Sequence, residues 1–255
     1  MKKMARLFYC LLCASFITSA LIAQTMDSAA VKPFNDGLDK IQKNDFTGAL
    51  TDFQQALAAS KDYRIYYQLG VVNEKLNKPD DAIANYKSTI AAKPDFEAVY
   101  NNLGSVYFAQ GKYQDAADNF QQVLKTSQDS TLKANVSFNI TLAYSGLATS
   151  AGKNSKKAIE YLTKAVSYTN YDLAYLNLAK NYFLINKYDK SIEAAQNALK
   201  YKKTISEGGP NYWLGVDYQK KNDAKKAKEY LTKAKEDPVY GKSAQTVLDA
   251  MAKQG

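Results

Sequence analysis

The chain has 255 residues, of which 46% are hydrophobic and 12% aromatic, so it contains ample apolar material for a continuous buried core. It has no histidine, and its two cysteines are Cys10 and Cys13, which excludes Ser-His and Cys-His nucleophile pairs and a zinc site of the usual ligands from the rest of the chain. Its net charge of +9 leaves open a partner of opposite charge.

Residues 1–23 are predicted to be a bacterial signal peptide. Three basic residues stand near the start, and residues 7–23 form an apolar run that ends in small side chains. Neither cysteine follows a small residue, which argues against lipidation. Cleavage after Ala20 or Ala23 would release an exported chain, periplasmic or secreted. An uncleaved membrane anchor is the alternative, because the run is close to the minimum spanning length. We favour cleavage because the run is short and ends in small residues.

Residues 30–62, 63–96 and 97–130 are each predicted to form a hairpin of two helices. In each stretch, apolar residues recur at helical spacing on both sides of a short turn. The third shows the pattern most clearly, because Gly104 in its first helix and Ala116 in its second are small enough to let the two helices approach closely.

Residues 134–170 are predicted to form a fourth hairpin with a longer turn. Residues 146–157 are rich in small side chains, glycine and serine, which indicates an exposed, flexible loop. The loop either contacts a partner or is a tolerated insertion, and we favour the insertion because long surface loops cost little stability.

A fifth hairpin is predicted in residues 172–203 and a sixth in residues 208–240, with an extended linker at residues 201–210. Residues 243–253 again place apolar side chains at helical spacing. They are predicted to form a helix that covers the last exposed apolar face.

Small residues recur at one position of each second helix and at one position of most first helices. They are Ala49, Ala82, Ala116, Ala158, Ser191 and Ala227 in the second helices and Gly37, Gly70, Gly104, Ala179 and Gly215 in the first. The pattern resembles that of the tetratricopeptide repeat family, whose repeat is about 34 residues long. The resemblance implies an all-α fold, a right-handed superhelical solenoid of about six helical hairpins with a C-terminal capping helix, in a single domain over residues 24–255.

The resemblance also implies a binding surface and no cofactor. In this family the first helices line a concave groove that takes a protein or an extended peptide. Carried over position by position, the predicted groove residues are Arg64, Tyr67, Asn102, Phe108, Phe138, Asn139, Asn177, Lys180, Phe183 and Trp213. A carboxamide both donates and accepts, so the asparagines could hold a peptide backbone; hydrogen bonding between repeats is the alternative. Some proteins of this family clamp a terminal carboxylate with lysine, asparagine and arginine side chains; that clamp is not reproduced here, because Phe34 and Leu38 fill the corresponding first-repeat positions.

Charge is uneven along the chain. Residues 24–149 have 12 basic and 14 acidic side chains, a net charge of −2, and residues 150–255 have 19 and 11, a net charge of +8. The predicted function is a non-catalytic protein-interaction scaffold of the bacterial cell envelope. The alternative is a binder of an anionic envelope polymer or a membrane surface through the basic half. Because acidic residues are interleaved with the basic ones, we favour the interpretation that the basic residues form solvated helix faces rather than a binding surface for an anionic polymer. No nucleic-acid partner is expected.

Overall fold

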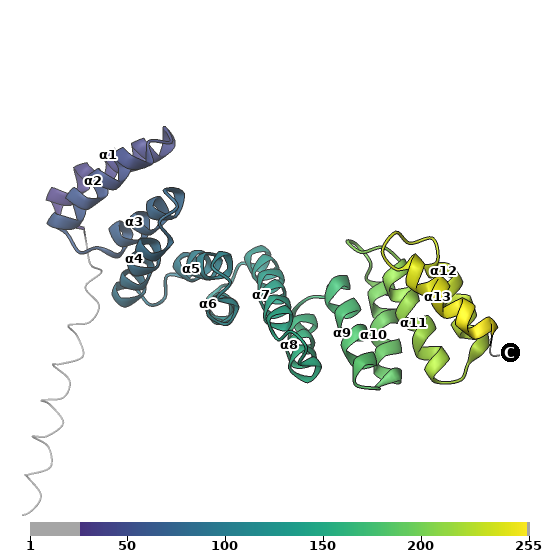
Figure 1. The fold of residues 1–255 in the computed structure, drawn as a ribbon. Helices are drawn as coiled ribbons and strands as arrows, with labels where there is room; N and C mark the ends of the chain where they lie inside the picture. Colours follow the sequence, from purple (N-terminus) through teal and green to yellow (C-terminus); the bar gives the residue numbers. More distant parts are fainter. Residues whose placement is uncertain (1–25, 254–255) are drawn as a thin grey trace, which may run out of the picture. The chain divides into compact units, whose positions relative to one another are not determined.

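The computed structural model describes residues 26–253, and these residues form thirteen α-helices and no strand (Figure 1). The predicted all-α fold is therefore confirmed, whereas the predicted signal peptide lies outside the described residues. The chain divides into two compact units, called here unit 1, which ends at Val99, and unit 2, which begins at Tyr100. In the described part of the chain, no helix has both the length and the apolar character needed to cross a membrane.

The helices follow one another through short connections, and consecutive helices pack in pairs. Unit 1 contains α1 (Ser28–Gln42), α2 (Phe46–Ala59), α3 (Tyr63–Lys75) and α4 (Pro79–Ala92). The boundary between the units falls in the first turn of α5 (Glu97–Ala109). Unit 2 continues with α6 (Tyr113–Thr126), α7 (Ser130–Ser150), α8 (Ser155–Tyr168), α9 (Asp172–Leu184), α10 (Tyr188–Lys200), α11 (Gly208–Lys220), α12 (Ala224–Ala234) and α13 (Gly241–Ala252).

Four hairpins pack a glycine of the first helix against a large side chain of the second. A Cβ atom added at Gly70 would lie 2.3 Å from the ring of Tyr86, and one at Gly104 would lie 2.7 Å from the ring of Phe120. Both rings are almost completely buried. The same relation holds for Gly37 with Phe53 and for Gly215 with Leu231. The small-residue register predicted from the sequence is thus confirmed, because only glycine leaves room for these contacts.

The turns inside the regular hairpins share one backbone conformation. The residue with positive φ is Asn44, Asn77, Gly111, Asn186 or Asn222. The N–H group of the next residue donates to the carbonyl oxygen five residues earlier, as from Lys78 to Asn73 at 2.8 Å. This left-handed cap satisfies carbonyl groups at the end of the first helix, and asparagine and glycine tolerate it best.

Helix α7 corrects one prediction. Residues 146–150, expected to open a flexible loop, continue the helix, and only residues 151–154 separate α7 from α8. Gly146 is suited to this place because the ring of Tyr113 lies on it, 2.8 Å from where a Cβ atom would be. The hydroxyl groups of Thr149 and Ser150 donate to carbonyl oxygens one turn earlier. The insertion therefore mostly lengthens the first helix of the fourth hairpin.

The second predicted insertion, residues 201–210, is also shorter than expected. Its last three residues begin α11 and are buried, so the connection from α10 comprises residues 201–207. The predicted covering helix is present as α13, which starts at Gly241 and packs chiefly on α12.

Candidate functional site

The predicted groove residues all lie on first helices of the hairpins, but they differ in how free their side chains are. They are distributed as Arg64 and Tyr67 on α3, Asn102 and Phe108 on α5, Phe138 and Asn139 on α7, Asn177, Lys180 and Phe183 on α9, and Trp213 on α11. The two on α3 belong to unit 1 and the others to unit 2.

In unit 1, the side chain of Arg64 is held by Asp62. Its Nε donates to Oδ1 of Asp62 at 2.8 Å and its Nη2 donates to Oδ2 at 2.7 Å. Burial of Asp62 opposes its ionisation, but the hydrogen bonds and charge of Arg64 outweigh this and lower the pKa of that carboxyl. The ring of Tyr67 is half-buried and meets Phe96 edge-on at 4.9 Å between centroids. Both side chains therefore support the fold of unit 1 as well as its surface.

In unit 2, Phe108 and Asn139 come together. With Ser105, Leu142 and the ring of Phe120 they line a small pocket of about 100 Å³. Residues from α5 and α7 thus form one continuous surface, as expected for first helices of neighbouring hairpins.

Phe138 is exposed, whereas the other predicted groove aromatic residues are half-buried. Its side chain is 41% exposed and meets only Tyr171 among the aromatic rings of the described chain, edge-on at 5.7 Å between centroids. Among the described residues, no hydrogen bond engages the side chains of Asn139 or Asn177. Both carboxamides therefore remain available to a ligand, and in the described chain neither forms a hydrogen bond between repeats.

Phe183 and Trp213 are both half-buried, and their ring centroids lie 5.3 Å apart. Both pack against an apolar cluster that includes the completely buried Leu231, together with side chains of α13 such as Leu248 and Met251. Trp213 therefore belongs to the packing between the sixth hairpin and α13. Truncating either ring would disturb the fold as well as the surface.

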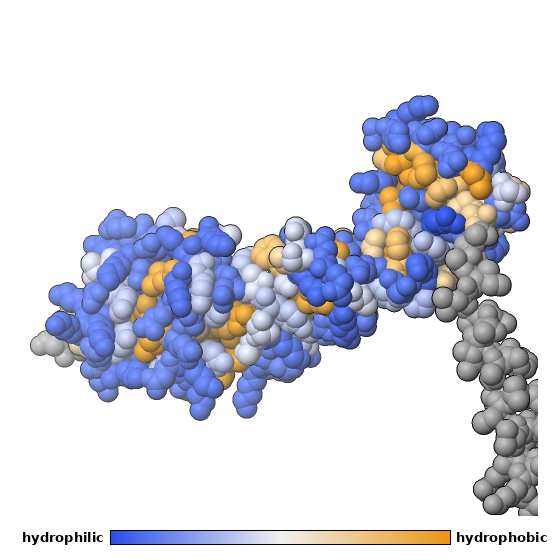
Figure 2. All heavy atoms as spheres, turned by 180° about the vertical axis from the view of Figure 1, so that it is seen from behind, coloured by the Kyte–Doolittle hydropathy of each residue, from blue (hydrophilic) through white to orange (hydrophobic). Residues whose placement is uncertain are grey.

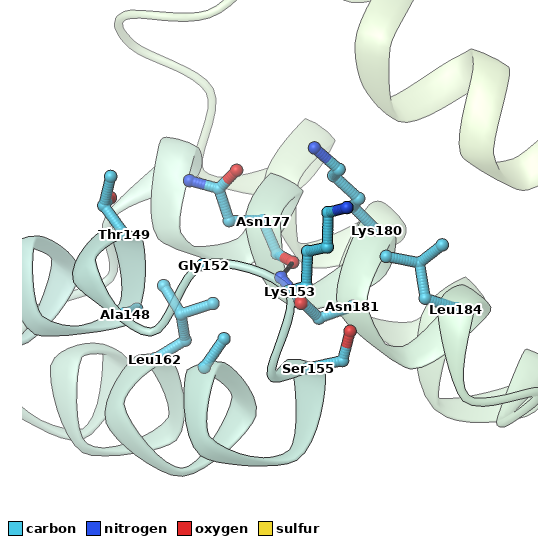
Figure 3. A pocket seen from close by; sticks show the side chains of 11 residues that line it. Ala148, Thr149, Gly152, Lys153, Ser155, Leu162, Asn177, Lys180, Asn181 and Leu184 are labelled. Atoms are coloured by element: carbon cyan, nitrogen blue, oxygen red, sulfur yellow. Dashed lines mark hydrogen bonds between the residues drawn. The ribbon is translucent and has the colours of Figure 1, made fainter.

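Asn177 and Lys180 line a second pocket, of about 320 Å³, between the end of α7, the start of α8 and α9 (Figure 3). Sequence reasoning missed its other polar residues, Thr149, Lys153, Ser155 and Asn181. Thr149 and Lys153 fall in the stretch that was expected to be a flexible loop. The extra length of the fourth repeat is the sequence feature that indicates these residues, but that length alone does not predict that α7 is longer.

Part of the positive charge of unit 2 is engaged locally. Ion pairs join lysines to nearby carboxylates at Lys164–Glu160, Lys202–Glu207, Lys221–Asp189, Lys226–Asp223 and Lys233–Glu229. The face in Figure 2 shows hydrophobic strips between hydrophilic residues over the C-terminal helices. Within residues 26–253, no three metal-binding side chains of the His, Cys, Asp or Glu type come together.

Comparison with known proteins connects this arrangement to a family. Models described as tetratricopeptide repeat match residues 34–95, 67–131 and 210–236. The human tetratricopeptide repeat protein 6 is 26% identical over 85 residues, which is 33% of this chain and 16% of that protein. The mouse DnaJ homolog subfamily C member 3 is 34% identical over 80 residues, 31% of this chain and 16% of that protein. The chain thus matches about one sixth of the length of each relative.

Solved structures of the same kind align with more of the chain. One is YrrB, described as a TPR protein with an unusual peptide-binding site, at 20% identity and a TM-score of 0.49, covering 76% of this chain and 97% of that one. Another is MamA, at 26% identity and a TM-score of 0.46, covering 65% of this chain and 94% of that one.

Proposed function

The chain belongs to the tetratricopeptide repeat family, and we propose that it is a non-catalytic scaffold that binds an extended segment of a partner protein on the first helices of unit 2. The observation that carries this proposal is the set of free side chains on α7 and α9. Helix α7 carries an exposed aromatic ring, Phe138, and a carboxamide, Asn139, and α9 carries a second carboxamide, Asn177; neither carboxamide makes a hydrogen bond within the described chain. Such a set can hold an apolar side chain and a peptide backbone together.

We also propose that the chain is exported to the bacterial cell envelope after cleavage of residues 1–23. The basic start and apolar run of this segment support the proposal. Intact mass and N-terminal sequencing of the native protein test it. A protein that starts at residue 21 or 24 is expected. A native protein that keeps Met1 and sediments with membranes would instead be an anchored scaffold.

Phe138→Ala is expected to weaken peptide binding by about 2 kcal/mol, because aromatic anchors dominate interfaces of this kind. Its stability should change by less than about 1 kcal/mol, since the ring is exposed and meets only one other aromatic ring. The measurement uses peptides selected from a displayed random library on the chain without residues 1–23. Fluorescence anisotropy then gives their affinities, and urea unfolding gives the stability of each variant.

The matched control is Val239→Ala. Val239 is 75% exposed, lies in the connection between α12 and α13, and is remote from the first-helix positions in sequence. It should leave affinity unchanged. Wild-type affinity in Phe138→Ala, together with lost binding in Lys225→Glu/Lys226→Glu, would contradict the proposal and favour an anionic partner on the basic faces.

A further inference from the structure

The pocket between α7 and α9 exists because α7 is longer than the other first helices. The additional turns carry Ala148 and Thr149, and the short connection that follows carries Lys153. Across from them, α9 contributes Asn177 and Lys180. The volume of about 320 Å³ is at the lower end of the range for ligand pockets, so it suits one or two side chains rather than a large molecule.

The charges lining this pocket are all positive. Lys153 and Lys180 are exposed, and neither forms an ion pair with a described carboxylate. None of the residues that line the pocket is acidic. Figure 3 shows the side chains of Lys153 and Lys180 extending toward the same side of the pocket, and in this view the Asn177 carboxamide lies between them and Thr149. Two ammonium groups that share a pocket repel each other, and a bound carboxylate would offset that repulsion.

The asparagine side chains that line the pocket add directional hydrogen-bonding groups to the two positive charges. Asn181 donates from Nδ2 to the carbonyl oxygen of Asn177 at 2.9 Å, which fixes its orientation. The side chain of Asn177 makes no hydrogen bond with the described chain and can donate to a carboxylate or bind a peptide backbone. The lysines and the amides together provide the donors that a carboxylate requires.

The pocket also has an apolar side. Leu162 is almost completely buried and, with the small residues Ala148 and Ala158, forms its apolar lining. Leu184 is 56% exposed at its edge, which is unusual for so large an apolar side chain. A ligand that covers Leu184 would gain contact area next to its charged group.

We propose that this pocket binds an aspartate or glutamate side chain of the partner segment and that the neighbouring apolar side chain of that segment covers Leu184. The inference rests on the proposed function and names the chemistry of the partner. The lysines that carry it lie on α9 and on the extension specific to the fourth hairpin. They are not in the first repeat, where Phe34 and Leu38 fill positions that the family's clamp for a terminal carboxylate uses.

The test selects random peptides, fused through their C-termini to a phage coat protein, on the chain without residues 1–23. Enriched peptides are then synthesised with an acetylated N-terminus and an amidated C-terminus, so that only side chains can supply a carboxylate. We expect enrichment of an acidic residue beside a large apolar one. Replacing that acidic residue by its amide should weaken binding roughly tenfold or more.

Lys153→Gln/Lys180→Gln is expected to cause a similar loss of affinity, roughly tenfold. It should add little to the loss caused by replacing the acidic residue of the peptide by its amide, since both changes break the same contact. Lys225→Gln/Lys228→Gln on α12 is the matched control. It removes the same charge from exposed positions and should leave affinity nearly unchanged. Thermal unfolding should be the same for both variants, because all four lysines are exposed and unpaired in the described chain.

The outcomes separate the two proposals. The carboxylate proposal would be contradicted by peptides that lose binding to Phe138→Ala but need no acidic residue, or that bind Lys153→Gln/Lys180→Gln as tightly as wild type. Either result would leave the scaffold function in place. An equal loss in both lysine variants would also contradict the carboxylate proposal, because general attraction would then explain the binding. If no peptide is enriched on the folded chain, the scaffold function itself is contradicted. Restoration of binding by a free C-terminal carboxylate alone would assign the pocket to chain ends and overturn the side-chain proposal.

Discussion

Asp172→Ala is expected to lower the stability of unit 2 by about 3–5 kcal/mol, because the carboxylate holds the connection between α10 and α11. Asp172 is almost completely buried at the start of α9. Its Oδ2 accepts hydrogen bonds from the backbone N–H groups of Lys203 at 2.6 Å, Thr204 at 2.5 Å and Ile205 at 3.2 Å. Its Oδ1 accepts from the hydroxyl group of Thr204 at 2.7 Å. The alanine variant leaves these donors without their acceptor.

The same contacts predict how this contribution depends on pH. Burial of Asp172 opposes ionisation, but the donors from Lys203, Thr204 and Ile205 outweigh burial and hold the pKa of that carboxyl well below its usual 3.8. A lowered pKa in the folded state means that the contribution is complete above the ordinary pKa and is lost as the pH falls below it. The difference between wild type and Asp172→Ala should therefore shrink in strong acid.

Urea unfolding at neutral pH and in acid measures both effects. Glu193→Ala on α10 is the control, since that carboxylate is exposed, and it should change stability by less than about 0.5 kcal/mol. A cost below about 1 kcal/mol for Asp172→Ala at neutral pH would show that residues 201–207 do not depend on the carboxylate.

Asp217→Asn is expected to raise stability at alkaline pH. Between mild acid and alkaline pH, the difference in unfolding free energy between the variant and wild type should shift by about 4 kcal/mol in favour of the variant. Asp217 lies on α11 and is completely buried, and no group in the described chain donates a hydrogen bond to either carboxyl oxygen. The hydroxyl group of the neighbouring Ser191 donates to the carbonyl oxygen of Ala179 at 2.9 Å instead. An ionised carboxylate is therefore costly at this position.

The pKa of Asp217 is raised to about 7: burial is the largest cause, the nearby Asp189 adds to it, and Ser191 and Lys221 act in the opposite direction. Because the folded-state pKa is raised, this carboxyl favours the folded chain most below its ordinary pKa of 3.8, and the benefit is lost as the pH rises through about 7. Asparagine has nearly the same shape and does not ionise, so its variant should not lose stability over this range.

The measurement compares urea unfolding of wild type and Asp217→Asn at about pH 4 and about pH 9. The difference between the two proteins should change with pH, with the variant relatively more stable at the higher value. Asp249→Asn is the control, because Asp249 is exposed on α13. Parallel pH profiles for wild type and Asp217→Asn would show that the buried carboxyl does not change its protonation on folding.

The hairpins themselves could be predicted from the sequence, because their determinants lie close together in the chain. Gly104 and Phe120 are separated by little more than four helical turns, and their sizes must match wherever two antiparallel helices touch. The asparagines at the turns act over even shorter distances, since their left-handed conformation ends the preceding helix locally. Local spacing and residue size therefore determined the fold class and the first-helix surface.

The tertiary structure decided the features that depend on contacts between hairpins. Gly146 and its small neighbours have loop-like propensities, but the ring of Tyr113 packs on Gly146 and the helix continues past it. Context of this kind overrides propensity because burial contributes more than the modest intrinsic preference of a few residues. The pocket with Lys153 follows from that extension, and so could not be read from residue types alone.

The freedom of each predicted groove residue was decided in the same way. Phe138 and Trp213 occupy related positions in the sequence pattern, but Phe138 is left exposed, whereas Trp213 is half-buried in the apolar cluster to which α13 contributes. Asp172 is near the expected start of a helix, where a carboxylate is common, but its partners stand about thirty residues later in the chain. A one-dimensional pattern specifies which face a side chain occupies, and only packing between distant segments determines whether that side chain is free to bind a partner.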